Sequence, residues 1–351
     1  MNQEIILIDK YQEKDYKKRG MTLLCLILLT ILGLGYIYFR GGSLDALIKA
    51  SEILGFSLLG TLISFPLSLV MPKGKKISYI LSSLSSGFIF ALFLPIGVDF
   101  KFVIISSISM SVLSFIFRLC FKKPVIHPSI FALTIMYIFN KDGLTSLLNG
   151  KSVLINIQDM PVSDLYSLKM SSFDIASKGL ISDGIYSWRL FIGDYFGTIG
   201  AGIIIALVVI MAFLTFYKSL KGSIPIVYLC SLYLLFFISY YLVKAKLINC
   251  FSRSLNMVLF NEFVFSSFVL SDTEYVEKNT ISTYALVILT SAVSYLCYYY
   301  FNGYLAVLIS MAFFEVLRPM FSFIKNKAVS ITLLVISLCV FLLPLVVVGV
   351  Y

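Results

Sequence analysis

Long apolar runs separated by short polar segments dominate the hydropathy pattern of this 351-residue chain. A helix needs roughly 20 apolar residues to cross a bilayer. The pattern predicts an all-α polytopic membrane protein of 10–11 transmembrane helices, with candidate spans at about 21–39, 51–71, 77–97, 102–117, 125–139, 199–217, 223–243, 254–271, 281–301, 303–324 and 328–350. The runs at 102–117 and 125–139 are short, so we expect them to be tilted, broken or partly buried in protein.

The predicted spans form two groups on either side of one long polar stretch. The expected segments are a cytoplasmic amino terminus at 1–20, a first membrane half at 21–139, an extracytoplasmic loop at 140–198, a second membrane half at 199–324 and an additional carboxy-terminal span at 325–351. Phe88–Leu94 resembles Phe263–Val269, at an offset of 175 residues (263 minus 88). Five spans in each half would give the halves opposite orientations, as in inverted repeats. A chance match between apolar segments is the alternative.

Composition and charge support the membrane interpretation. Hydrophobic residues make up 59% of the chain and charged residues only 13%, whereas soluble domains have about 25% charged residues. A soluble enzyme, a disordered tail and a disulfide scaffold are therefore excluded. The net charge of +10 arises mainly in short loops, where 17 cationic residues fall on one predicted side and 6 on the other. The positive-inside rule then predicts a multi-pass protein of the cell membrane with a cytoplasmic amino terminus, and not a nucleic-acid partner.

Few residues offer chemistry of their own. The six cysteines lie far apart and His127 is the sole histidine, so we expect no metal site. Ionisable groups inside spans are functional candidates by default. Glu262 has no local partner, which makes it an ion or proton ligand or a residue near the interface. Glu315 lies three residues before Arg318 on the same helix face, so the two can neutralise each other, and Asp272 is expected at the inner water boundary.

A glycine-rich stretch precedes the predicted sixth span. Gly193, Gly197 and Gly200, with Thr198 between them, bring the backbone close to a neighbour and then open a helix. The unpaired N–H groups of a helix start favour an anion such as phosphate. We therefore expect a phosphate-binding element here, although glycine-rich helix starts are also common in membrane proteins without that role.

Five segments occur in the same order as elements of the membrane flavoproteins RnfD and NqrB, over about residues 80–323. In the first half, Leu94-Pro95 resembles the family's Leu-Pro-Pro, and Phe121–Leu133, with His127-Pro128-Ser129, resembles its Asn-Pro-Ala element. Before the sixth span, Gly193–Gly200 resembles the family's Gly-x-x-Pro-Gly-Ser-x-Gly-Glu. In the second half, Phe268–Thr273 resembles Phe-Met-Ala-Thr-Asp-Pro, and Gly303–Ile309 through Arg318-Pro319 resembles the closing Glu-Gly-Val segment. The resemblance implies a ten-helix fold of two inverted five-helix halves that carries electrons across the bilayer through flavin.

The resemblance also implies where flavin would be held. The family attaches FMN to a threonine in the outer loop before the sixth span, and the corresponding loop here contains Asp183, Gly184 and Ser187. No threonine lies between Thr145 and Thr198, so we expect any flavin to be noncovalent or carried by a partner. The family's Glu after the third glycine is Ala201 and its Asn near the last proline is Glu315, so ion pumping of the family's kind is not implied.

A reduced relative fits these departures. EetB, the RnfD-like subunit of Gram-positive extracellular electron transfer, works with the flavin-bearing partner EetA and a quinone pool. The resemblance therefore implies an FMN-bearing partner similar to EetA or RnfG, with quinone as a further redox partner. Two alternatives remain: an inverted-repeat solute permease or channel-like transporter in which Glu262 and the short fifth span shape the substrate site, and a scaffold subunit that anchors a redox partner.

Overall fold

The computed structural model describes residues 2–41, 44–94, 97–120, 127–140, 144, 200, 204–242, 261–273, 280–300 and 303–322. Within these residues the chain is helical, and its only extended pairing is an isolated bridge between Leu220 and Asp272. Three helical stretches are long and apolar enough to cross a membrane: Tyr16–Gly35, Leu47–Ser68 and Phe100–Cys120. Shorter apolar helical stretches are Pro128–Phe139, Ile204–Phe216, Ser223–Ser239 and Ser282–Tyr298.

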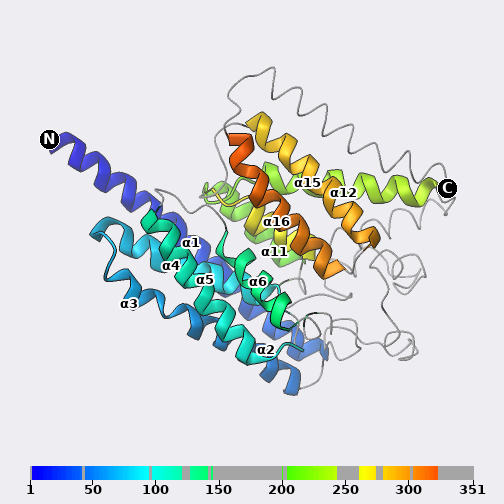
Figure 1. The fold of residues 1–351 in the computed structure, drawn as a ribbon, viewed down its shortest axis with the longest axis horizontal. Helices are drawn as coiled ribbons and strands as arrows, with labels where there is room; N and C mark the ends of the chain where they lie inside the picture. Colours follow the sequence, from blue (N-terminus) through cyan, green and yellow to red (C-terminus); the bar gives the residue numbers. More distant parts are fainter. Residues whose placement is uncertain are drawn as a thin grey trace.

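The first group of helices contains α1 (Asn2–Gly41), α2 (Leu44–Thr61), α3 (Ser64–Ser68), α4 (Lys73–Leu92), α5 (Phe100–Cys120) and α6 (Pro128–Phe139). Helix α2 packs on α5, and α4 packs on α1, α2 and α6 (Figure 1). Small side chains allow these approaches. Ser57 on α2 donates a hydrogen bond to the Gly87 carbonyl oxygen at 2.9 Å, and the Tyr79 hydroxyl donates to the Ser111 carbonyl oxygen at 2.9 Å.

The second group contains α11 (Ile204–Phe216), α12 (Ser223–Leu242), α14 (Asn261–Val264), the π-helix η3 (Phe265–Leu270), α15 (Thr280–Tyr300) and α16 (Gly303–Ser322). Helix α15 packs between α12 and α16, and η3 contacts both α12 and α16. The first group has the corresponding arrangement, because α5 packs between α2 and α6 there.

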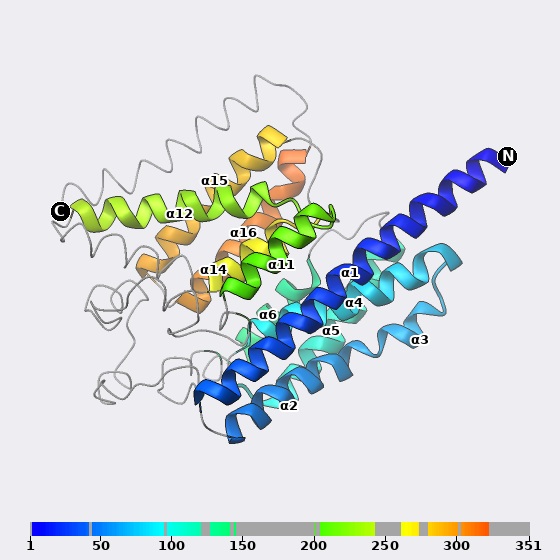
Figure 2. The ribbon, with the colours of Figure 1, turned by 180° about the vertical axis from the view of Figure 1, so that it is seen from behind.

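Among the described helices, the strongest contacts that join the groups are α1 with α11 and α6 with α16. Figure 1 shows the blue-to-cyan helices α1 to α5 on one side and the green-to-orange helices α11 to α16 on the other. Figure 2 shows the same division from behind, with α11 beside α1. The buried apolar residues form one cluster that includes members of both groups.

Two predictions about the short spans have different outcomes. The run at 102–117 is part of α5, a continuous helix of 21 residues, so it is not broken, but one face of it is buried in the protein, as one of the expected alternatives held. Phe100 and Lys101 at its start and Arg118–Cys120 at its end extend the helix beyond the apolar run. The run at 125–139 is short, as expected: α6 begins at Pro128, because proline fits the first turn of a helix, and has 12 residues.

Candidate functional site between the two helix groups

One short segment of the second group contributes a residue to each of two buried polar centres among the described residues. It begins with Glu262 in α14, continues through the π-helix η3, and reaches Asp272 two residues after η3 ends. All six residues of η3 are buried. π-Helical turns are rare and occur frequently at functional sites, because they change the direction of side chains and loosen backbone hydrogen bonding. This segment contains the apolar sequence that resembles Phe88–Leu94 of the first group.

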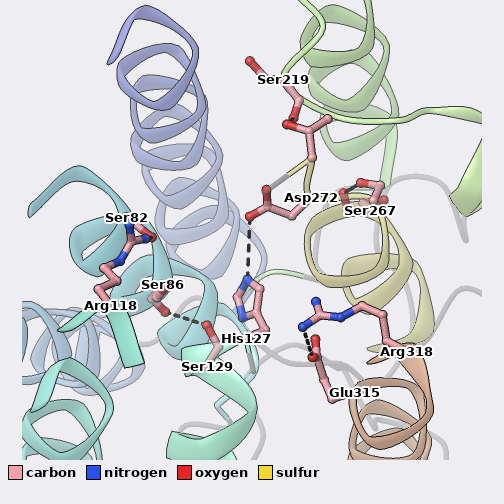
Figure 3. Close-up of polar contacts among 12 residues, drawn as sticks. Ser82, Ser86, Arg118, His127, Ser129, Ser219, Ser267, Asp272, Glu315 and Arg318 are labelled. Atoms are coloured by element: carbon pink, nitrogen blue, oxygen red, sulfur yellow. Dashed lines mark hydrogen bonds and ion pairs between the residues drawn. The ribbon is translucent and has the colours of Figure 1, made fainter. Parts of the chain in front are cut away.

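The first polar centre lies where the helix groups meet, and we call it the inter-group cluster: His127, Asp272, Glu315 and Arg318. His127 immediately precedes α6 and is 1% exposed, with its Nε2 4.0 Å from Asp272 Oδ2. On α16, Arg318 Nη2 lies 3.0 Å from Glu315 Oε2. Figure 3 shows His127 between Asp272 and this ion pair. Glu315 also lies beside the backbone of His127 and within electrostatic reach of Asp272.

The charge balance of the inter-group cluster depends on its histidine. Two carboxylates and one guanidinium leave a net charge of about −1 when the imidazole is neutral, and protonation of His127 would bring the cluster to neutrality. The cluster is partly accessible, because the Asp272 side chain is 28% exposed while those of Glu315 and Arg318 are at most 10% exposed. It can therefore exchange a proton or bind a small polar group from the side on which Asp272 lies.

The loop between α11 and α12 fixes the position of Asp272. The Lys221 N–H donates to the Ser271 carbonyl oxygen at 3.0 Å, and the Thr273 hydroxyl donates to the Ser219 carbonyl oxygen at 2.9 Å. The Ser219 hydroxyl in turn donates to the Lys18 carbonyl oxygen of α1 at 3.3 Å. The residue predicted at the inner water boundary thus lies beside two segments that the charge pattern also places on the cytoplasmic side.

The second polar centre is Glu262 with three surrounding hydroxyl groups, which we call the Glu262 cage. Glu262 is fully buried, with 0% exposure. Its Oε2 accepts a hydrogen bond from the Tyr228 hydroxyl at 2.6 Å, and its Oε1 accepts one from the Ser294 hydroxyl. The Tyr298 hydroxyl lies beside the same carboxyl group. Helices α12 and α15 therefore supply the polar partners that no local sequence pattern around Glu262 revealed.

Sequence reasoning missed Tyr228, Ser294 and Tyr298 as members of a site. One signal was available: Ser294 and Tyr298 are four residues apart in a helix, so they lie on the same face. Tyr228 had no such signal, because its contact with Glu262 spans 34 residues of sequence. A tyrosine in an apolar helix is equally consistent with ordinary core packing, and Tyr228 also makes an edge contact with the Phe265 ring.

Most of the predicted flavin-phosphate residues lie outside the described residues, namely Asp183, Gly184, Ser187, Gly193, Gly197 and Thr198. Gly200 is described, and it lies against the end of α4. A Cβ added there would be 2.8 Å from Leu92 Cβ and 3.1 Å from the Leu92 carbonyl oxygen. The expected close backbone approach at this glycine is thus present, and the neighbour it approaches is another helix.

The described residues contain no group of three or more His, Cys, Asp or Glu side chains arranged to hold a metal ion. The site accordingly consists of hydrogen-bonded and ion-paired side chains, at the meeting of the helix groups and inside the second group. No protein-family model matches the chain, and no curated protein matches it. The likeness to RnfD and NqrB therefore rests on the sequence segments alone.

Proposed function

We propose that this protein is an integral-membrane electron-transport subunit of an Rnf/Nqr-like or extracellular electron-transfer complex. In this role it passes electrons between a quinone pool or redox partner and flavin at the outer face of the cell membrane. The flavin is held noncovalently or by an FMN-bearing partner that docks on the outer loop. The amino terminus lies in the cytoplasm.

The observation that carries this proposal is the convergence of segments that lie far apart in the sequence. Three of the five segments that resemble RnfD and NqrB are neighbours of one another in the fold, and a fourth lies against the end of α4, close to the fifth. His127 contacts Asp272 and lies beside Glu315, and Gly200 packs against Leu92, two residues before Leu94. Residues that act together in one site must be neighbours in space, whereas chance matches in apolar sequence have no reason to meet.

The helix contacts also support the inverted arrangement of two halves. The pairs that join the groups are α1 with α11, the first helix of each half, and α6 with α16, the fifth helix of each half. Ser219, just after α11, bonds to Lys18 near the start of the apolar part of α1. His127, just before α6, lies beside Glu315 in the carboxy-terminal half of α16. In each pair, the end of one helix therefore lies near the start of its counterpart, so the two run in opposite directions, as a twofold axis in the membrane plane requires.

A solute permease is the second candidate, and the inter-group cluster favours it. Transporters with inverted repeats hold their substrates near the midplane, where short or broken helices from the two repeats meet. Here the 12-residue α6 and the segment containing η3 meet at the inter-group cluster. The inter-group cluster could contact either an electron-transfer partner or a polar solute. The two functions therefore differ in whether electrons or a solute cross the membrane.

Proteoliposomes with trapped ferricyanide distinguish the two functions. Reduced FMN is added outside under anaerobic conditions, with menaquinone in the bilayer, and its oxidation is followed optically. An electron-transfer subunit oxidises external FMN faster than protein-free vesicles do. We expect Asp272→Asn to slow this reaction and Asp99→Asn to leave it unchanged, because Asp99 is exposed in the loop before α5. A rate equal to that of protein-free vesicles would contradict the proposal and favour the permease.

A further inference from the structure

The Glu262 carboxyl group is buried without a compensating positive charge among the described residues. The ion pairs His127–Asp272 and Glu315–Arg318 nearby involve other acids. The groups that interact with Glu262 are the hydroxyls of Tyr228, Ser294 and Tyr298 and the thiol of Cys297. A buried carboxylate with no cation is strongly disfavoured unless hydrogen bonds replace its lost hydration or it takes up a proton.

The hydrogen bonds fit the ionised form of Glu262. Each carboxylate oxygen accepts a bond from a different hydroxyl, one from α12 and one from α15. Bonds from hydroxyl groups to an ionised acceptor are short and about twice as strong as bonds between neutral groups. Two such bonds offset a large part of the desolvation cost, so the ionised form is accessible although the side chain is fully buried.

The protonated form also has a partner within the Glu262 cage. A neutral carboxylic acid needs an acceptor for its O–H. The Tyr298 hydroxyl is buried beside Glu262 and is directed to donate to the carboxylate, and rotation about its C–O bond lets its oxygen accept the bond of the acid's proton instead. The cage therefore offers donors to the carboxylate and an acceptor to the acid. A purely structural glutamate needs only one of these two sets of partners.

The segment that carries Glu262 also links it to the water boundary. Ser266, Ser267 and Ser271 lie between Glu262 and Asp272 within and just after η3, and all three are buried. Asp272 at the far end is partly exposed. No charged side chain occurs within η3 itself. On the packed helices, the titratable neighbours are Tyr228 on α12 and Cys297 and Tyr298 on α15, while the charged residues of α16 pair with each other.

We propose that Glu262 is a reversible proton-binding site of the second helix group. The carboxylate takes a proton from hydronium, forming one O–H bond and releasing water, and returns the proton to water by the reverse step. Tyr228 and Ser294 stabilise the ionised state, and Tyr298 accepts the hydrogen bond of the protonated state. This site does not depend on the proposed electron transfer, since it would serve a proton-coupled permease equally well.

Infrared spectroscopy of the full-length protein in lipid nanodiscs tests this site directly. We expect a carboxylic-acid C=O band at low pH that is replaced by carboxylate bands as the pH rises and that is missing from Glu262→Gln. Glu52→Gln is the matched control, because Glu52 is exposed on α2, and it should leave the Glu262 band unchanged. Tyr298→Phe removes the acceptor and should shift both the band frequency and the titration midpoint.

Three results would overturn the proposal. A band that persists at every pH would make Glu262 a permanently neutral structural residue, and its absence at every pH would make it permanently ionised. Loss of the band on addition of sodium at constant pH would instead make the cage a metal-ion site. If the glutamine variant does not fold, Glu262→Asp, which keeps a carboxyl group, should shift the band and its titration midpoint rather than remove the band. None of these results depends on flavin or quinone activity, so this proposal and the proposed function fail separately.

Discussion

The crossing of α2 and α5 at Gly60 allows a sharp test of the fold with an internal control on the same helix. A Cβ added at Gly60 would lie 2.5 Å from Ser107 Cβ and 3.0 Å from the Ile104 carbonyl oxygen. These neighbours are a Cβ and a backbone atom, which cannot move without moving α5. By contrast, a Cβ added at Gly55 would meet no atom within 4 Å. Both glycines lie in α2, and Gly55 is exposed.

The two alanine substitutions should therefore have effects of opposite sign. Gly60→Ala forces the helices apart, and overpacking of this kind costs about 1–3 kcal/mol in the free energy of unfolding. Gly55→Ala adds no contact and restricts the unfolded chain, so it should stabilise the protein by roughly 0.5–1 kcal/mol. The expected difference between the variants is about 1.5–4 kcal/mol, the sum of these two estimates. Close packing through small residues is a main source of helix association in membranes.

Buried cysteines provide the assay for this prediction. Cys25 on α1 and Cys297 on α15 are 4% and 8% exposed, so each should react with a fluorogenic maleimide only when its helix group opens. After the exposed thiols are blocked, heating in detergent should release fluorescence at a lower temperature in Gly60→Ala than in the wild type, and at an equal or higher temperature in Gly55→Ala. Equal midpoints for wild type and Gly60→Ala would show that α2 and α5 do not approach as described.

Three further predictions concern the ion pair, the topology and the flavin. Removing either Glu315 or Arg318 breaks the buried ion pair and should destabilise the protein by about 3–5 kcal/mol. The double variant, Glu315→Gln with Arg318→Gln, should lower the free energy of unfolding by less than either single variant. A double-mutant cycle in the same thermal assay measures this difference. A cysteine introduced at Ser163 should react with an impermeant maleimide from outside intact cells, and one at Lys218 only after permeabilisation; the reverse pattern would invert the topology. The denatured chain should show no flavin fluorescence in a gel even when an FMN transferase is co-expressed, and a fluorescent band that Ser187→Ala abolishes would contradict this.

Hydropathy predicted where the helices lie because it reports how each segment is solvated, but it could not predict every break. The run at 51–71 was expected as one span, and Leu47–Ser68 is a single stretch long enough to cross a membrane, but its helix is interrupted at Leu62 and Ile63, between α2 and α3. Pro66 follows the break, and it has no N–H to donate to the carbonyl oxygen four residues earlier, at Leu62. The proline was visible in the sequence. Its effect depended on whether neighbouring helices would tolerate a bend, which no local pattern contains.

The polar centres were predictable only where their members are close in sequence. Glu315 and Arg318 share a helix face, and the structure confirms their pairing at 3.0 Å. The His127–Asp272 and Tyr228–Glu262 contacts join residues of different helices. Such contacts depend on how the helices cross, and the crossings depend on small residues spread over the whole chain. The sequence therefore identified Glu262 and Asp272 as candidates without their partners.

The proposed internal repeat would account for a buried acid at this position in the second helix group and its absence from the first. At the offset of 175 residues that aligns Phe88 with Phe263, the position equivalent to Glu262 is Gly87 (262 minus 175). The Gly87 carbonyl oxygen accepts a hydrogen bond from Ser57 of α2, just as Glu262 accepts one from Tyr228 of α12. A Cβ at Gly87 would lie 2.6 Å from Thr61 Cγ2, so no glutamate fits there without displacing α2. The two groups thus share a packing scheme, in which the first uses the position for close helix contact and the second uses it for a carboxyl group surrounded by hydroxyls.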